Sequence, residues 1–137
     1  MALKRMVLRD FVIVQALELE FCSGFTALTG ETGAGKSILI DALQLALGAR
    51  ADTGLVREGA QRTEVSAEFE SLAALQPWLE QAGFELSDTL LLRRTVDIQG
   101  KSRAWINGSP ATAAQLRTVG EQLLDIHGQH AWQSLMR

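Results

Sequence analysis

The stretch Gly30-Glu31-Thr32-Gly33-Ala34-Gly35-Lys36-Ser37 decides the fold. Its three glycines within six residues predict a tight turn, because glycine adopts left-handed backbone conformations without steric cost. The apolar residues 25–29 precede it and predict a short buried strand. From Lys36 onward apolar residues recur at helical spacing, and Gly48 is a natural stop for that helix. The stretch is therefore predicted to connect a strand to a helix.

The fixed positions of this stretch match the pattern Gly-x-x-x-x-Gly-Lys-Ser, known as Walker A. The inward-facing backbone N–H groups of such a loop, together with the positive end of the following helix, form a nest for phosphate oxygens. Lys36 adds a positive charge suited to bridging the β- and γ-phosphates, and the Ser37 hydroxyl is a suitable Mg²⁺ ligand. The sequence therefore predicts that residues 30–37 bind a nucleoside triphosphate with Mg²⁺.

The identity of the base is inferred by exclusion. The chain lacks the Asn-Lys-x-Asp motif that recognises guanine, and its sole asparagine is Asn107. This disfavours GTP and leaves ATP as the expected nucleotide. With no tyrosine in the chain, the residues that contact adenine are left open.

Composition indicates a globular protein of one domain or one lobe of a larger one. The chain has 137 residues, 47% hydrophobic and 21% charged, which are ordinary values for a folded domain. Its net charge of −3 offers no overall attraction to nucleic acid, so any such contact needs a local basic patch. No stretch reaches the roughly 18 apolar residues of a membrane span. A cytoplasmic location is therefore expected.

The remaining residues alternate between predicted strands and helices. Residues 3–11, 14–21, 64–70, 90–96 and 102–106 read as strands, and Asn107-Gly108 as a hairpin turn. Residues 71–82 predict a short helix whose start lies nearer Gln76 because of Pro77. Residues 112–122 predict a second helix, and residues 123–126 one more short strand. The expected fold is α/β, with an antiparallel strand layer and a parallel core around residues 25–29.

The sequence shows no convincing acidic strand for hydrolysis. P-loop ATPases need a carboxylate that ends an apolar strand to hold the metal and activate water. Leu90-Leu91-Leu92 runs into two arginines, and Leu123-Leu124-Asp125 offers only two apolar residues. The chain is therefore predicted to bind ATP without a complete catalytic set.

Longer stretches resemble the RecN family of bacterial DNA repair proteins, which are SMC-like ATPases of the ABC class. The resembling segments run in order along nearly the whole chain. They are residues 10–14, 17–24, 29–42, 47–51, 56–60, 102–108 and 126–130. The resemblance implies a P-loop NTPase fold of the ABC/SMC head type, in which residues 1–137 form the N-terminal lobe with a mixed sheet and a Walker A helix. It also implies nucleoid-associated action in double-strand-break repair and recombination.

The resemblance further implies a composite active site. In the full protein a coiled coil and a C-terminal lobe would follow, and two heads would enclose ATP as a homodimer, with DNA as a further partner. Gln129 matches the glutamine of the Q-loop, which ligates Mg²⁺ and orients the attacking water; the alternative is a polar loop residue. Lys36 and Gln129 are thus the expected catalytic contributions of this chain.

Several arginines carry weaker predictions. Arg57 lies where SMC-like heads place an arginine implicated in sensing DNA or nucleotide; the alternative is a solvated arginine or a surface pair with Glu58 or Glu64. A basic patch across a hairpin, made of Arg93, Arg94, Lys101 and Arg103, would suit phosphate groups, but charged residues on exposed strands are also common. The tryptophans Trp78, Trp105 and Trp132 are expected in the core or at an interface.

Two other functions remain open at this stage. A small P-loop kinase or nucleotidase would share the Walker A loop but would need an acid-bearing strand and a mobile arginine lid. An ATP-gated interaction module would bind nucleotide to control assembly without hydrolysing it. The leading hypothesis is the ATP-binding lobe of a RecN-like ATPase that is inactive in hydrolysis by itself.

Overall fold

A computed structural model of the chain describes residues 3–20, 33–70 and 73–127. Its strands are β1 (Leu3–Phe11), β2 (Val14–Glu20), β3 (Arg62–Glu70), β4 (Thr89–Asp97), β5 (Ser102–Ile106) and β6 (Ser109–Ala111). Its α-helices are α2 (Gly33–Ala46), α3 (Gln76–Ala82) and α4 (Ala113–His127). Two short 3-10 helices, η1 (Thr53–Leu55) and η2 (Ala73–Leu75), complete the set. Within the described ranges, no helix has the length and apolar character of a membrane span.

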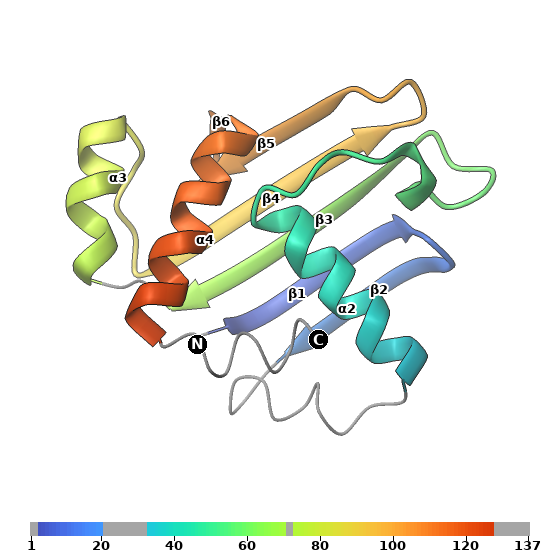
Figure 1. The fold of residues 1–137 in the computed structure, drawn as a ribbon, viewed down its shortest axis with the longest axis horizontal. Helices are drawn as coiled ribbons and strands as arrows, with labels where there is room; N and C mark the ends of the chain where they lie inside the picture. The colour runs from blue at the N-terminus through green and yellow to red at the C-terminus, as the bar shows by residue number, and fades with distance from the viewer. Residues whose placement is uncertain (1–2, 21–32, 71–72, 128–137) are drawn as a thin grey trace.

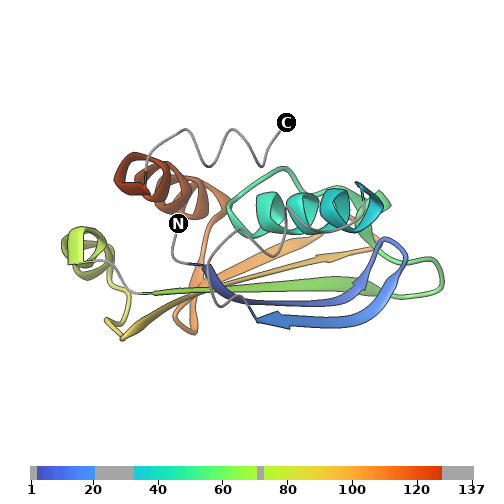
Figure 2. The ribbon, with the colours of Figure 1, turned by 90° about the horizontal axis from the view of Figure 1, so that it is seen from below.

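The strands form one six-stranded sheet in the order β2-β1-β3-β4-β5-β6. Every neighbouring pair in it is antiparallel. The helices α2, α3 and α4 lie on one side of this sheet, and the opposite face carries none of them (Figures 1 and 2). The described residues thus form a two-layer α/β structure in which one face of the sheet, called here the helix-free face, carries no described helix.

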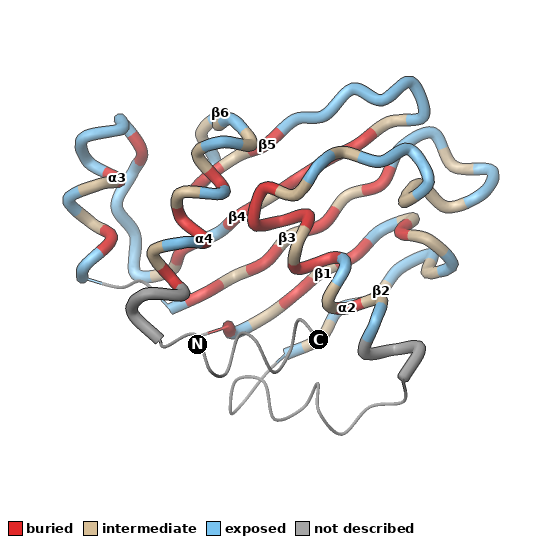
Figure 3. Tube along the Cα trace, viewed as in Figure 1, coloured by how far each residue is buried: buried red, intermediate tan, exposed pale blue. Residues whose placement is uncertain are grey.

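The alternation of side chains along the strands explains the position of the core. In β3 the residues Thr63, Val65, Ala67 and Phe69 are buried, whereas those between them are only partly buried. Since successive side chains of a strand point to opposite faces, the buried set lies beneath the helices. Leu39, Leu43, Leu116, Val119 and other buried apolar residues of α2 and α4 complete this core. Buried residues recur along the central strands of the sheet and along α2 and α4 (Figure 3).

Most predicted elements are confirmed. Asn107 and Gly108 have φ angles of 50° and 85° and connect β5 to β6, as the turn signal predicted. The helix after residue 71 begins its α-helical part at Gln76, with Pro77 in its first turn, and ends at Gly83 in the left-handed conformation. The predicted strand at residues 25–29, and with it the parallel core, lies outside the described residues.

The predicted strand at residues 123–126 is wrong, because α4 continues through these residues to His127. Leu116, Val119 and Leu123 are all fully buried at spacings of three and four residues. Leu123 therefore extends the apolar stripe of the helix instead of starting a strand. Gly120 lies within the same helix and packs against Leu47, whose Cβ would be 3.4 Å from a Cβ added at that glycine.

Candidate functional site

The helix α2 carries the second half of the Walker A stretch. It starts at Gly33, three residues before the predicted start at Lys36. Its backbone thus includes Gly33, Ala34, Gly35, Lys36 and Ser37, and Ser37 is exposed. Gly30, Glu31 and Thr32 of the predicted loop lie outside the described residues, as does Gln129. Ser37 is therefore the one side chain of the predicted nucleotide site whose exposure the structure gives.

A helix N-terminus is suited to phosphate because its first N–H groups have no partner within the helix. These groups and the aligned peptide dipoles place about half a positive charge there. The fourteen-residue length of α2 is more than three turns, so the dipole is well developed. At the start of α2 this field combines with the exposed Ser37, an arrangement suited to an anionic ligand.

The opposite end of α2 is fixed by two arginines, a role that the sequence did not predict for either of them. Arg94 of β4 donates from Nη1 to the carbonyl oxygens of Leu45 and Ala49, at 3.0 and 2.9 Å. Arg117 of α4 donates from Nη1 to the carbonyl oxygen of Gly48 at 2.9 Å. Positive groups at a helix C-terminus satisfy its free carbonyls and complement its dipole. The Walker A helix is thereby anchored to both β4 and α4.

Gly48 allows this close contact between α2 and α4. Its φ of 97° is in the left-handed region, which ends the helix as the sequence predicted. A Cβ at this position would lie 2.5 Å from Cγ of Arg117 and 2.6 Å from the carbonyl oxygen of Ala113. Only glycine fits both the conformation and the space. The end of α2 therefore lies directly against α4, as Figure 1 shows.

Arg94 is the most deeply buried charged residue of the described chain, with 2% of its surface exposed. Burial, and secondarily the nearby charge of Arg117, lowers the pKa of its guanidinium. Burying a charged group costs free energy, and a third hydrogen bond, from Nε of Arg94 to the Ser102 hydroxyl at 2.6 Å, helps to offset that cost. Because Arg94 points into the core, the prediction that it belongs to a surface basic patch is wrong. Its neighbour Arg93 points to the opposite face, as the period of a strand requires.

Arg57 pairs with Asp10, and not with Glu58 or Glu64 as the sequence left open. Its Nε lies 3.0 Å from Oδ1 of Asp10, and its backbone N–H donates to the Asp10 carbonyl oxygen at 2.8 Å. Asp10 and Val12 have φ angles of 49° and 56°, unusual for residues other than glycine. The contacts from Arg57, and the bond from Val12 N–H to the Leu55 carbonyl oxygen, hold this turn between β1 and β2.

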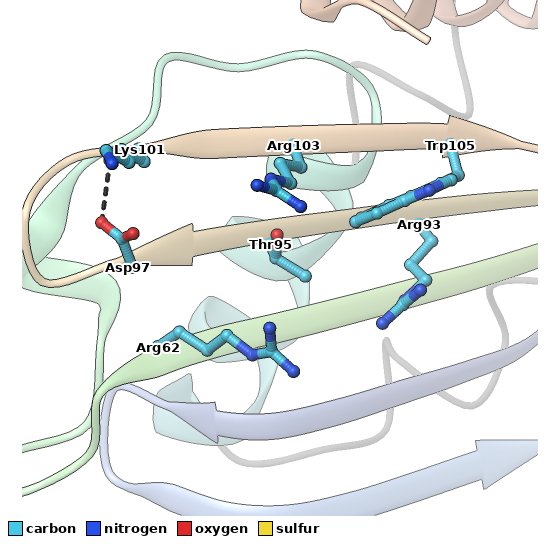
Figure 4. Close-up of a pocket in the computed structure, with 7 residues that line it drawn as sticks. All are labelled: Arg62, Arg93, Thr95, Asp97, Lys101, Arg103 and Trp105. Atoms are coloured by element: carbon cyan, nitrogen blue, oxygen red, sulfur yellow. Dashed lines mark hydrogen bonds between the residues drawn. The ribbon is translucent and has the colours of Figure 1, made fainter. Parts of the chain in front are cut away.

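A basic surface lies on the helix-free face of the sheet. Seven residues of β3, β4, β5 and the connecting turn line one pocket there: Arg62, Arg93, Thr95, Asp97, Lys101, Arg103 and Trp105. Their side chains stand on the side of the sheet away from the helix ribbons (Figure 4). Three of the four predicted patch members are thus brought together, and Arg62 joins them. Arg62 was missed because it is distant in sequence and meets the hairpin only through the pairing of β3 with β4.

The tryptophans divide between the core and this surface. Trp78 stacks on Phe84 with ring centroids 6.0 Å apart and packs against the core, as predicted. Trp105 is half-buried on the basic surface, where the guanidinium carbon of Arg93 lies 4.4 Å from its ring centroid. Trp132 lies outside the described residues.

Comparison with known proteins identifies the family and the fold class of the chain. A family model described as an AAA domain matches residues 5–103, and the chain belongs to that family. Among solved structures, one from work on ATP-driven dimerization and DNA-stimulated activation of SMC ATPases superposes with a TM-score of 0.67 at 25% identity. The match covers 86% of this chain and 76% of that one. The expected SMC-type head fold is therefore confirmed.

The relatives by sequence are DNA repair proteins named RecN, which confirms the resemblance drawn from the residues. RecN of Vibrio cholerae is 47% identical over 137 residues, covering 98% of this chain and 25% of that protein. RecN of Bacillus subtilis is 43% identical over 141 residues, covering 98% and 24% respectively. The chain thus spans about a quarter of the length of these relatives.

Proposed function

We propose that this chain is the ATP-binding lobe of a RecN-like ATPase acting in DNA double-strand-break repair and recombination. The observation that carries the proposal is the Walker A sequence at the start of a long helix whose other end is held by Arg94 and Arg117. A fixed helix keeps its N–H donors aimed at one position without a reorganisation cost. The similarity to RecN proteins supplies the biological context.

In this proposal each site residue has a defined role. The backbone of residues 30–35 surrounds the phosphates, Lys36 neutralises the β- and γ-phosphates, and Ser37 and Gln129 ligate Mg²⁺. When bound, Mg²⁺ supplies charge neutralisation on the phosphates. Gln129 also orients water near the γ-phosphate. Arg57 acts as a sensor of DNA or nucleotide, for which a phosphate would have to replace Asp10 as its partner.

The proposal also covers the parts that complete the site. Residues 1–137 form the N-terminal lobe of an SMC-like head in a cytoplasmic, nucleoid-associated protein. A coiled coil and a C-terminal lobe of the full protein, and a second head, contribute the remaining catalytic groups.

Titration calorimetry of the chain with ATP and Mg²⁺ tests the nucleotide site. We expect Lys36→Ala to weaken binding at least about tenfold, because hydrogen bonds to charged groups contribute about 1.5–3 kcal/mol. Lys4→Ala is the matched control, since Lys4 is an exposed lysine of β1. Unchanged affinity in Lys36→Ala, or an equal loss in Lys4→Ala, would refute the assignment of residues 30–37.

A further inference from the structure

The basic surface defined by Arg62, Arg93, Thr95, Asp97, Lys101, Arg103 and Trp105 is not used by the nucleotide site. Strand pairing sets its layout: Asp97 lies opposite Arg62, Thr95 opposite Arg103, and Arg93 opposite Trp105. Neighbouring strands are about 4.8 Å apart, so the backbones carrying Arg62 and Arg103 are separated by roughly 10 Å. Two long cationic side chains therefore flank β4 on one open face (Figure 4).

Three of the four cations on this surface form no ion pair with any described carboxylate. Arg93 forms an ion pair with Glu64 and stacks on Trp105, so it is already engaged. Arg62, Lys101 and Arg103 are exposed, and their side chains have no hydrogen bond or ion pair within the described ranges. The single lining carboxylate, Asp97, accepts the backbone N–H groups of Gln99 and Lys101, both at 2.9 Å, and so serves the β4–β5 turn.

The charge on this face is unevenly distributed across the sheet. Toward the other edge, Arg5 lies within 4 Å of both Glu18 and Glu68, and Glu20 adds another exposed carboxylate. Arg9 of β1 is an exposed cation on the same face, opposite Glu64, whereas Arg62, Lys101 and Arg103 gather over β3, β5 and the β4–β5 turn in a chain whose net charge is −3. Such a local concentration in an acidic protein marks a site for an anionic partner.

The geometry favours a repeating phosphate backbone over stacked bases. Proteins that bind single strands present open aromatic faces to successive bases. Trp105, the one aromatic residue of this surface, already has one ring face occupied by the Arg93 guanidinium. Exposed cations on three neighbouring structural segments instead suit duplex DNA, whose two phosphate backbones present about one negative charge per 1.7 Å of helix axis.

We propose that Arg62, Lys101 and Arg103 bind the phosphate backbone of duplex DNA on the helix-free face of the sheet, without reading its bases. The choice of DNA as the polyanion rests on the proposed function, whereas the location rests on the side chains alone. Arg93, which pairs with Glu64 and stacks on Trp105, is not counted among the phosphate-binding groups. The proposed DNA surface is formed by β3, β4, β5 and the β4–β5 turn and uses no residue of α2.

Binding of a fluorescent duplex of about 20 base pairs, measured by anisotropy without nucleotide across a salt series, tests the proposal. We expect the double variant Arg62→Ala/Arg103→Ala to bind more than about tenfold more weakly, and the slope of log K against log salt to become shallower by about 2. The matched control is Lys4→Ala/Arg50→Ala, which removes the same charge from two exposed positions outside the surface. Thermal unfolding of both double variants verifies that they are folded.

The outcomes separate this proposal from its alternatives. The proposal is overturned if the unaltered chain does not bind the duplex, or if Arg62→Ala/Arg103→Ala leaves the DNA affinity and the salt slope unchanged. It is also overturned if the control Lys4→Ala/Arg50→Ala loses as much DNA affinity. Preference for phosphatidylserine vesicles over the duplex would replace DNA with a membrane surface. ATP titration of the same proteins keeps the two hypotheses distinct: retained ATP binding with failed DNA binding rejects only the DNA surface.

Discussion

At the scale of single residues, Arg94 connects the sheet to the helix of the proposed nucleotide site. Its guanidinium is buried and donates to Leu45, Ala49 and Ser102. We expect Arg94→Met to lower the free energy of unfolding by about 2–3 kcal/mol, because the Ala49 carbonyl oxygen would lose its side-chain donor and the Leu45 carbonyl oxygen would keep only the Gly48 N–H. Urea unfolding followed by circular dichroism measures this change.

Arg93→Met is the matched control, since it removes the same group one residue away on the opposite face. Its ion pair with Glu64 is partly exposed, and such pairs contribute about 1 kcal/mol or less. Equal destabilisation by the two substitutions would contradict the role given to Arg94. The sequence could not distinguish these arginines, because three leucines at 90–92 place apolar groups on both faces of the strand and hide its alternation.

At the scale of elements, α4 depends on a capping box at its start. The Gln115 N–H donates to the Thr112 hydroxyl at 3.0 Å, and the Thr112 N–H donates to Oε1 of Gln115 at 2.9 Å. We expect Thr112→Ala to lower the free energy of unfolding by about 1 kcal/mol. Thr118→Ala, within the same helix, should change it by a few tenths of a kcal/mol at most, because alanine has the higher helix propensity. Equal losses in urea unfolding would show that the cap does not stabilise α4.

Residues 123–126 were predicted as a strand but belong to α4, which shows that a short apolar run does not by itself distinguish a strand from a helix. Leu123, Leu124 and Ile126 form a short apolar run that is compatible with either a strand or a buried helix turn. The deciding contacts are tertiary, because Leu123 continues the stripe of Leu116 and Val119 against the core. By contrast, residues 107–108 and Gly83 were predicted correctly, since left-handed turns select their residues locally.

At the scale of the whole molecule, the sequence predicted the α/β class and the strands β1 to β5, but not the short edge strand β6. The Walker A motif and the resemblance to RecN proteins could be recognised from the order of the residues alone. The grouping of Arg62 with Arg103, and the anchoring of α2 by Arg94 and Arg117, came only from strand pairing and packing. Such contacts join residues tens of positions apart, which periodicity within a short window does not report.

The whole chain is expected to bind ATP with Mg²⁺ but to release phosphate no faster than the Lys36→Ala variant. Hydrolysis needs an acid at the end of an apolar strand. Of the described strands, β2 and β3 end in Glu20 and Glu70 but alternate polar and apolar residues, and the Asp97 carboxylate at the end of β4 is engaged by the β4–β5 turn. A phosphate-release assay at saturating ATP compares the two proteins. Turnover clearly above that of Lys36→Ala would mean that this chain holds its own catalytic acid, and the composite site would have to be abandoned.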